Sequence, residues 1–326
     1  MFVIIIKISN FNSYSFFFLI MNIINAAPNL FDIRLGLKGT NFTSLLSSWV
    51  YKDKDLCFLV DPGPSSVIDS LKQALNTLGI SNIDLKFILI THAHMDHAGG
   101  VGELIKYFPQ AQVICHPRGI KHLVNPEKLW KGSLKVLGEV ARLYGEITPV
   151  PEDRIKYQEF VSNGKIEVIE TLGHAPHHQS YLFDRYLFAG EVAGVNIPIA
   201  DNSFTRPATP PVFNYEISIA SIQKLLARNL ADYMICYGHF GLKGNAELHL
   251  KIAEEQLTIW VEVIEKLFEN REQPDFFNQV IEELKKKDKY FLSLDLMDEN
   301  TRKKELYFIG NCIKGIEGYI HKKKMI

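Results

Sequence analysis

The stretch THAHMDHAGG, residues 91–100, places three histidines and an aspartate within six positions: His92, His94, Asp96 and His97. It follows LKFILI, residues 85–90, an all-apolar run typical of a strand buried on both faces. Polar groups at the mouth of such a strand are costly to desolvate unless something pairs them, as a divalent cation does. Histidine and aspartate suit zinc, iron or manganese, whereas calcium takes oxygen ligands. The stretch therefore predicts a metal site, with a solvated polar loop as the alternative.

Four other apolar segments also end on polar residues. Asp61 follows LCFLV, His174 follows IEVIETLG, Glu191 follows YLFAG, and His239 follows MICYG. In layered α/β folds, sites collect where strand ends feed loops. Each of these residues is a weak signal alone. Together with the residues of 92–97 they favour a two-metal site at one edge of a sheet.

Composition excludes several classes of protein without selecting one. The chain has 326 residues, with 36 Lys and Arg against 37 Asp and Glu and a net charge of −1. This balance provides no basic surface for nucleic acid or for an anionic membrane. The four cysteines form no CxxC pair and lie in apolar contexts, which indicates buried thiols and favours the cytoplasm.

Three segments are expected along the chain. Residues 1–27 form an N-terminal extension whose apolar run is too broken for a membrane span; it is either a start upstream of true initiation at Met21 or a weak signal-like segment. Residues 28–245 alternate short apolar strands with helical patterns, which predicts an α/β body. Residues 246–326 carry long amphipathic helical patterns, which predicts a helical module.

The His-x-His-x-Asp-His motif of residues 92–97 resembles that of the metallo-β-lactamase superfamily of metal-dependent hydrolases, and the resemblance covers most of residues 30–245. The segment GHAPHHQSYLF, residues 173–183, resembles the GH-x-x-GH segment of the glyoxalase II-like branch, with His177 where that pattern has Gly. The resemblance implies a four-layer αββα sandwich with a C-terminal helical module.

The same resemblance implies roles for individual residues. Two sets of metal ligands follow from it: His92, His94 and His174 for the first ion, and Asp96, His97 and His239 for the second. Asp61 and His178 would orient the site from behind the ligands, and His177 would lie near the pocket. One position departs from the family, because Glu191 stands where the bridging ligand is usually Asp. We expect Glu191 still to bind metal.

The implied cofactors are two divalent ions, with zinc as the first choice and iron or manganese as alternatives. Metal lowers the pKa of a bound water to about 7, and the resulting hydroxide would attack a small ester, thioester or lactone. Asp96 would act in catalysis by holding this nucleophile through a hydrogen bond. The alternatives are a phosphodiesterase or nuclease, an iron-dependent redox enzyme, and a metal-bound sensor without catalysis. Net charge argues against the nuclease, and His94 argues against the flavodiiron type of redox enzyme, which has Glu there.

Two residues are expected to shape substrate choice. Arg206, in the Pro-rich segment 206–213, would pair an anionic group of the substrate, with an exposed loop arginine as the alternative. Tyr237, just before His239, is a second pocket candidate. The expected partner is a small molecule, with no nucleic acid and no membrane, and a homo-oligomer is left open.

Overall fold

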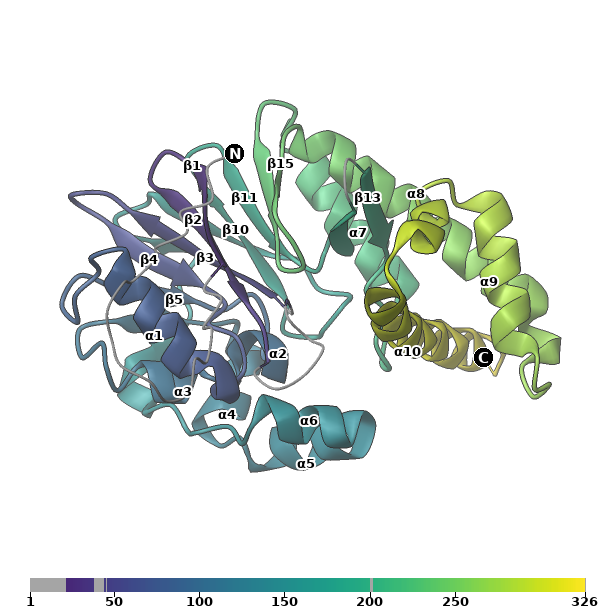
Figure 1. Ribbon diagram of the computed structural model, residues 1–326, viewed down its shortest axis with the longest axis horizontal. Helices are drawn as coiled ribbons and strands as arrows, with labels where there is room; N and C mark the ends of the chain where they lie inside the picture. The colour runs from purple at the N-terminus through teal and green to yellow at the C-terminus, as the bar shows by residue number, and fades with distance from the viewer. Residues whose placement is uncertain (1–21, 38–43, 45, 200–201, 326) are drawn as a thin grey trace, which may run out of the picture. The chain divides into compact units, whose positions relative to one another are not determined.

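The computed structural model describes residues 22–37, 44, 46–199 and 202–325. Its contacts divide the chain into two compact units, one ending at Tyr157 and the other beginning at Gln158. Each unit contains a β-sheet and helices, which confirms the expected α/β class and supplies the sheet and helix layers that an αββα sandwich needs (Figure 1). Most of the expected N-terminal extension, residues 1–21, lies outside the described residues, while residues 22–27 form a strand.

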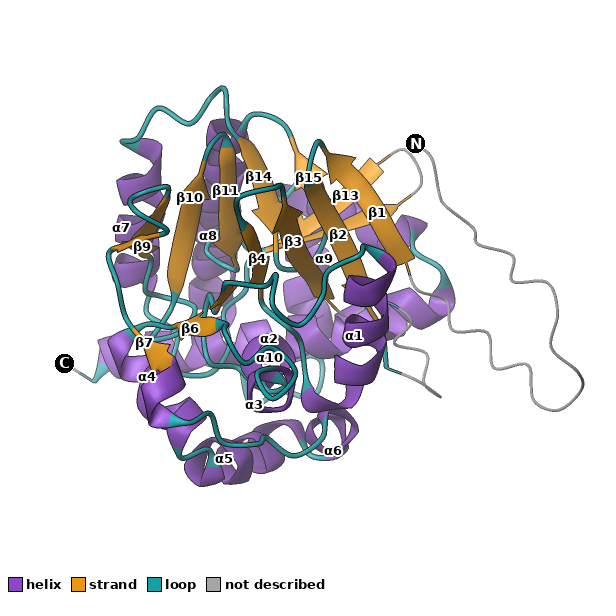
Figure 2. Cartoon of the chain, turned by 90° about the vertical axis from the view of Figure 1, so that its left-hand side faces the viewer, coloured by secondary structure: helices purple, strands orange, loops and turns teal. Residues whose placement is uncertain are grey.

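The sheet of the first unit has its strands in chain order, from β1 to β7 (Figure 2). The pairs from β1 to β4 are antiparallel, and those from β4 to β7 are parallel. Every residue of β4 is buried, as expected for an apolar strand covered on both faces. The strands are β1 Asn22–Ala27, β2 Leu30–Leu35, β3 Leu46–Lys52, β4 Cys57–Val60, β5 Phe87–Leu89, β6 Gln112–Ile114 and β7 Ile155–Lys156.

Helices of the first unit pack against this sheet through an apolar stripe. In α1, Ile68, Leu71 and Leu75 recur at helical spacing and join Leu59 and Ile88 of the sheet in one core. No helix or strand is predicted from the sequence in residues 117–144, and the structure forms three helices there, α4, α5 and α6. The helices are η1 Ser65–Val67, α1 Ile68–Thr77, α2 Met95–Ala98, α3 Val101–Leu104, α4 Pro117–Val124, α5 Glu127–Leu137, α6 Glu139–Tyr144 and η2 Glu152–Arg154.

In the second unit, the main sheet has the order β15-β14-β11-β10-β9-β8, and β12 and β13 form a separate pair. Strands β11 and β14 are parallel neighbours, so their C-terminal ends, at Gly190 and Tyr237, lie at the same edge. This register explains why Glu191 and His239 come close together. The strands are β8 Phe160–Val161, β9 Ile166–Glu170, β10 Gln179–Phe183, β11 Tyr186–Gly190, β12 Val195–Ile199, β13 Asn202–Arg206, β14 Met234–Tyr237 and β15 Leu242–Lys243.

Long helices complete the second unit and share one core with its sheet. Leu187 of β11 and Ile235 of β14 belong to the same apolar cluster as Trp260 and Ile316. The expected boundary after residue 245 falls at the first residue of α8, and the division into body and module stays a prediction. The helices are α7 Tyr215–Leu226, α8 Ala246–Leu267, η3 Phe268–Asn270, α9 Phe276–Lys287, η4 Phe291–Leu296 and α10 Glu299–Lys324.

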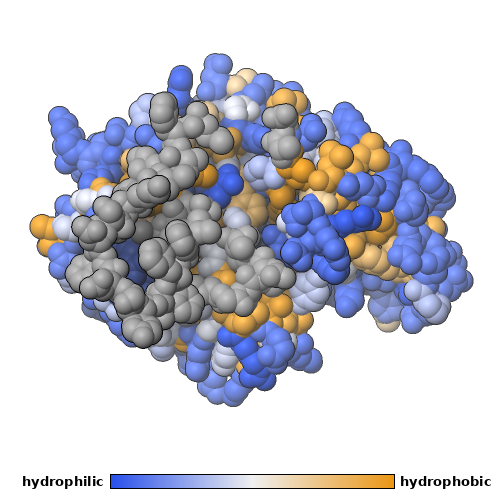
Figure 3. Space-filling model, in the orientation of Figure 1, coloured by the Kyte–Doolittle hydropathy of each residue, from blue (hydrophilic) through white to orange (hydrophobic). Residues whose placement is uncertain are grey.

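The surface over α9 is mostly polar. In Figure 3, hydrophilic side chains cover most of the surface over α9. Lys285 and Lys286 there form ion pairs with Asp295 and Glu283 at 2.9 and 2.7 Å. Across the part of the chain that the structure describes, no helix combines the length and the apolar character needed to cross a membrane.

Asn245, the N-cap of α8, provides a test of how this helix begins. Its side chain accepts a hydrogen bond from the backbone N–H of Leu248 at 2.9 Å, and its φ of 55° is left-handed. We expect Asn245→Ala to lower the free energy of unfolding by about 1–2 kcal/mol, because alanine loses the cap and disfavours this φ. Asn245→Gly should cost less, because glycine adopts the left-handed region readily. Urea unfolding of both variants measures the difference, and equal losses would contradict this explanation.

Candidate metal centre

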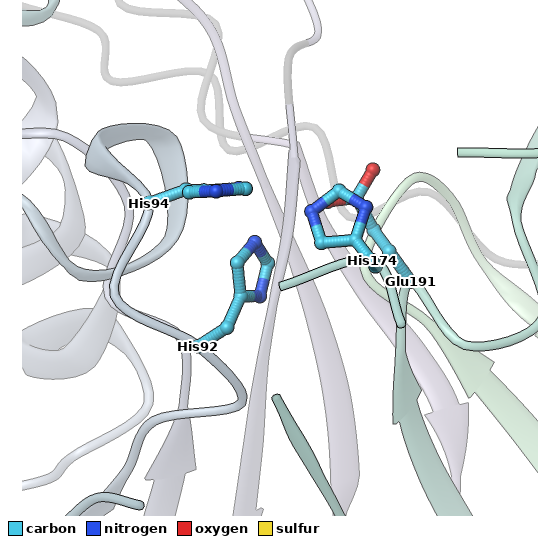
Figure 4. Close-up of side chains that lie close together, drawn as sticks. All are labelled: His92, His94, His174 and Glu191. Carbon is cyan, nitrogen blue, oxygen red and sulfur yellow. The ribbon is translucent and has the colours of Figure 1, made fainter. Parts of the chain in front are cut away.

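Four potential metal ligands of the first unit lie on the loop after β5 and on α2. His94 is the N-cap of α2, and Asp96 and His97 lie in its short helical turn. The ring centroids of His92 and His94 are 4.5 Å apart, edge to face (Figure 4), and those of His92 and His97 are 4.2 Å apart. Nε2 of His97 lies 3.7 Å from Oδ2 of Asp96. Three imidazoles and a carboxylate thus gather within one short segment.

Asp61, directly after β4, orients two of these imidazoles. Its buried carboxylate accepts hydrogen bonds from the backbone N–H of Thr91 at 2.8 Å, from the Thr91 hydroxyl at 2.6 Å, and from Nδ1 of His97 at 2.9 Å. Since the Thr91 hydroxyl hydrogen points to Asp61, its oxygen accepts the Nδ1–H of His92 at 3.0 Å. Both rings therefore carry hydrogen on Nδ1 and present the lone pair of Nε2, the arrangement typical of metal-binding histidines.

The second unit contributes three more potential ligands, each from the end of a different strand of its main sheet. Oε2 of Glu191 lies 2.8 Å from Nε2 of His174 (Figure 4), and Oε1 of Glu191 lies 3.7 Å from Nε2 of His239. Nδ1 of His174 lies 3.0 Å from the carbonyl oxygen of Ala208, which can only accept. Nδ1 therefore carries a hydrogen, and Nε2 of His174 is the ring nitrogen that faces the Glu191 carboxylate. Glu191 is buried, and its two oxygens face two different imidazoles.

His178 supports the backbone that carries Glu191. Its Nε2 accepts the backbone N–H of Glu191 at 3.0 Å, so Nδ1 carries the hydrogen and donates to the Thr171 hydroxyl at 2.9 Å. The chain of bonds continues from Thr171 to the Ser180 hydroxyl at 2.9 Å and from there to the carbonyl of Ala189 at 3.2 Å. Because the Glu191 amide occupies Nε2, we assign His178 a positioning role rather than a ligand role.

Arg206 and Tyr237, both expected in a substrate pocket, make contacts inside the second unit. Nε of the buried Arg206 donates to Glu305 of α10 at 3.0 Å, and Nη1 donates to the carbonyl of Pro207 at 3.3 Å. Burial by itself lowers the pKa of Arg206, but the surrounding charges, led by Glu305, outweigh it and raise the pKa above its usual value. The hydroxyl of Tyr237 lies 3.1 Å from Nδ1 of His249, and burial raises the pKa of this tyrosine. These contacts favour structural roles, and the substrate roles stay predictions.

Three groups that orient the ligands had not been expected from the sequence. Thr91 joins Asp61 to His92, Thr171 continues the bonds of His178, and the carbonyl of Ala208 fixes the ring of His174. Thr91 could have been found, since it lies next to the motif. A backbone carbonyl has no signal in the sequence. His177, expected near the pocket, is buried.

The donor set fits a divalent transition metal. Each unit combines imidazole nitrogens with carboxylate oxygens, which are the ligands that zinc, iron and manganese accept in proteins. In His92, His97 and His174 a hydrogen lies on Nδ1, so Nε2 is the ring nitrogen that would bind metal.

Comparison with known proteins identifies relatives of this chain. The model of the metallo-beta-lactamase superfamily matches residues 45–239. The metallo-beta-lactamase fold-containing protein ST1585 of Sulfurisphaera tokodaii is 29% identical over 236 residues, which cover 68% of this chain and 84% of the relative. The crystal structure of ST1585 from Sulfolobus tokodaii aligns with this chain with a TM-score of 0.58 and 28% identity. The alignment covers 72% of this chain and 86% of that one. A metallo-beta-lactamase family protein of Thermus thermophilus, TTHA1429, aligns with a TM-score of 0.61 over 91% of this chain and 95% of that one; at 18% identity this likeness shows the fold alone.

The bonds of Asp61 lead to a prediction about metal affinity. Asp61→Ala should weaken zinc binding about 10- to 100-fold, because His97 loses its partner and Thr91 no longer fixes His92. Competition with a chromophoric chelator measures the dissociation constant. The matched control is Asp69→Ala, whose side chain is exposed on α1 and should leave zinc affinity unchanged. Unchanged affinity in Asp61→Ala would show that Asp61 does not orient a metal ligand.

Proposed function

The chain belongs to the metallo-β-lactamase superfamily, and we propose that it is a two-metal enzyme that hydrolyses a small ester, thioester or lactone. In this proposal the residues divide between two ions, with His92, His94, His174 and Glu191 for the first and Asp96, His97 and His239 for the second. Superfamily membership and the His, Asp and Glu side chains together support a metal-dependent hydrolase. The choice of substrate and the assignment to the glyoxalase II-like branch are finer proposals.

The observation that carries the proposal is the fixed protonation of the imidazoles. Asp61, with Thr91, holds His97 and His92, and the Ala208 carbonyl holds His174, each with hydrogen on Nδ1. A core built only for stability would not need three rings held in the same tautomer. A metal site does need this, since only the unprotonated nitrogen can bind an ion.

The ions, when bound, would supply a water nucleophile at neutral pH and polarise the carbonyl oxygen of the substrate. The chain's own residues would then position the reaction. Asp96, half-buried beside His97, would accept a hydrogen bond from the nucleophile and hold it in line. Glu191 would act as a ligand at the position where the family usually has Asp, with one oxygen facing His174 and the other facing His239.

Other properties bear on the substrate and the compartment. The net charge of −1 provides no general attraction for a polyanion, which supports a small molecule over a nucleic acid. All four cysteines are buried as thiols, which supports the proposal of a reducing compartment such as the cytoplasm. Zinc is the proposed metal, with iron or manganese as alternatives.

Variants of the ligands test the metal assignment. Elemental analysis of the purified protein should find about two ions per chain, and His94→Ala should lose the first. Glu191→Asp should keep or raise the occupancy, because it restores the family's usual ligand, whereas Glu191→Ala should lower it. The exposed Glu139→Ala on α6 serves as the control. If both Glu191 variants bind metal like the parent protein, Glu191 is not a ligand.

Removal of the metal tests the reaction itself. Dialysis against a chelator should abolish hydrolysis of a panel of thioesters, esters and lactones, and added zinc should restore it. The same panel should include a phosphodiester, which we expect to remain intact. Hydrolysis of the phosphodiester alone would favour the nuclease class, and tight metal binding without any turnover would favour the sensor.

A further inference from the structure

A small cavity inside the second unit adjoins two of the proposed ligands, His174 and Glu191. Its volume is ≈ 20 Å³, enough for one or two groups the size of a water molecule. Apart from the two ligands, most of the side chains around it are apolar. They include Leu172, Val192, Phe213, Ile222, Ala253 and Leu257.

Polar side chains at the cavity are already engaged elsewhere. The Ser218 hydroxyl donates to the carbonyl of Asn214 at 2.8 Å, and the Thr209 hydroxyl donates to the carbonyl of Cys312 at 3.1 Å. Both hydroxyls therefore donate their hydrogens to backbone oxygens. A molecule bound in the cavity would therefore contact mainly apolar side chains. The polar groups of His174 and Glu191 lie at one end of the cavity.

The wall is held in place by close packing between α7 and the loop after β9. The Ser221 hydroxyl of α7 donates to the carbonyl of Leu172 at 2.6 Å. Gly173 has a φ of 135°, and a Cβ there would lie 2.3 Å from Oγ of Ser218, so only glycine allows this approach. The far wall comes from Ala253 and Leu257 of α8, which packs beside α7 (Figure 1). The small side chain of Ala253 leaves part of the space open.

We propose that this cavity binds the acyl chain of the substrate, and that it selects a short unbranched aliphatic group of one or two carbons beyond the carbonyl. The position of the two ligands at one end places the carbonyl beside His174 and Glu191 and its chain between α7 and α8. This inference rests on the proposed hydrolase function and adds to it the class of acyl group.

The test varies the acyl chain at a constant leaving group. With the 4-nitrophenyl esters of acetic, propanoic, butanoic and hexanoic acids, kcat/KM should rise about fourfold for each methylene that enters the cavity, which is ~0.8 kcal/mol each. It should rise from acetate to propanoate and fall for butanoate and hexanoate. A flat series would overturn the proposal, and so would a rise that continues to butanoate or hexanoate.

Variants that change the cavity should move this optimum. Ala253→Leu fills the space and should lower kcat/KM for propanoate about fourfold relative to acetate, the gain expected from one buried methylene. Leu257→Ala enlarges the cavity and should move the optimum toward butanoate. The control is Ala220→Leu, the same change at an exposed position of α7, which should leave the profile as in the parent. Thermal unfolding and metal content measure whether each variant is folded. If Ala253→Leu does not fold, the result for Leu257→Ala decides between the outcomes.

A binding measurement separates the cavity from the hydrolase. Calorimetry with acetate and propanoate should show higher affinity for propanoate in the parent and in Ala220→Leu, but not in Ala253→Leu. If no ester is hydrolysed and this pattern appears, the proposed hydrolase function is wrong and the cavity proposal is supported. If esters are hydrolysed and the two carboxylates bind equally well, the hydrolase function is supported and the cavity proposal is wrong.

Discussion

The buried carboxylate of Asp61 is the constraint on which the ligands of the first unit depend. A carboxylate taken out of water is costly unless hydrogen-bond donors satisfy it. Asp61 accepts from the backbone and the hydroxyl of Thr91 and from the ring of His97. The same bonds that compensate its burial fix the rotation and the tautomer of His97, and through Thr91 those of His92. The bonds that compensate the burial of Asp61 are therefore the same bonds that orient the two candidate ligands, and they tie the end of β4 to the loop after β5.

In the second unit, different groups orient the candidate ligands. Its imidazole at His174 is fixed by the carbonyl of Ala208, and the backbone of Glu191 is fixed by His178. Glutamate is one methylene longer than the usual aspartate, so its carboxylate reaches farther from the strand end. The support from His178 acts on the amide of Glu191 rather than on its carboxylate. It therefore holds the starting point of the side chain while leaving both oxygens directed at His174 and His239.

The helices of the second unit are part of the site's support. Arg206 at the end of β13 pairs with Glu305 of α10, so a long helix holds the segment that leads to Ala208. Gln256 and Trp260 of α8 both donate to the buried Asp288, at 2.7 and 3.0 Å, which secures α8 to the end of α9. Since α8 also forms a wall of the cavity beside Glu191, the packing of these helices sets the space proposed for the acyl chain.

Local patterns in the chain were sufficient to predict the α/β class, the strand ends and the identity of each candidate ligand. Apolar runs and the HAHMDH motif are properties of neighbouring residues, and strand periodicity and metal-ligand chemistry act on them directly. Tertiary packing decided what holds those ligands and what the nearby polar residues do. The bonds from Asp61 to Thr91 and His97 span 30 and 36 positions, and that from Arg206 to Glu305 spans 99. Such partners become neighbours only when strands and helices pack, so a run of sequence around Arg206 or Tyr237 cannot show that one faces α10 and the other faces His249.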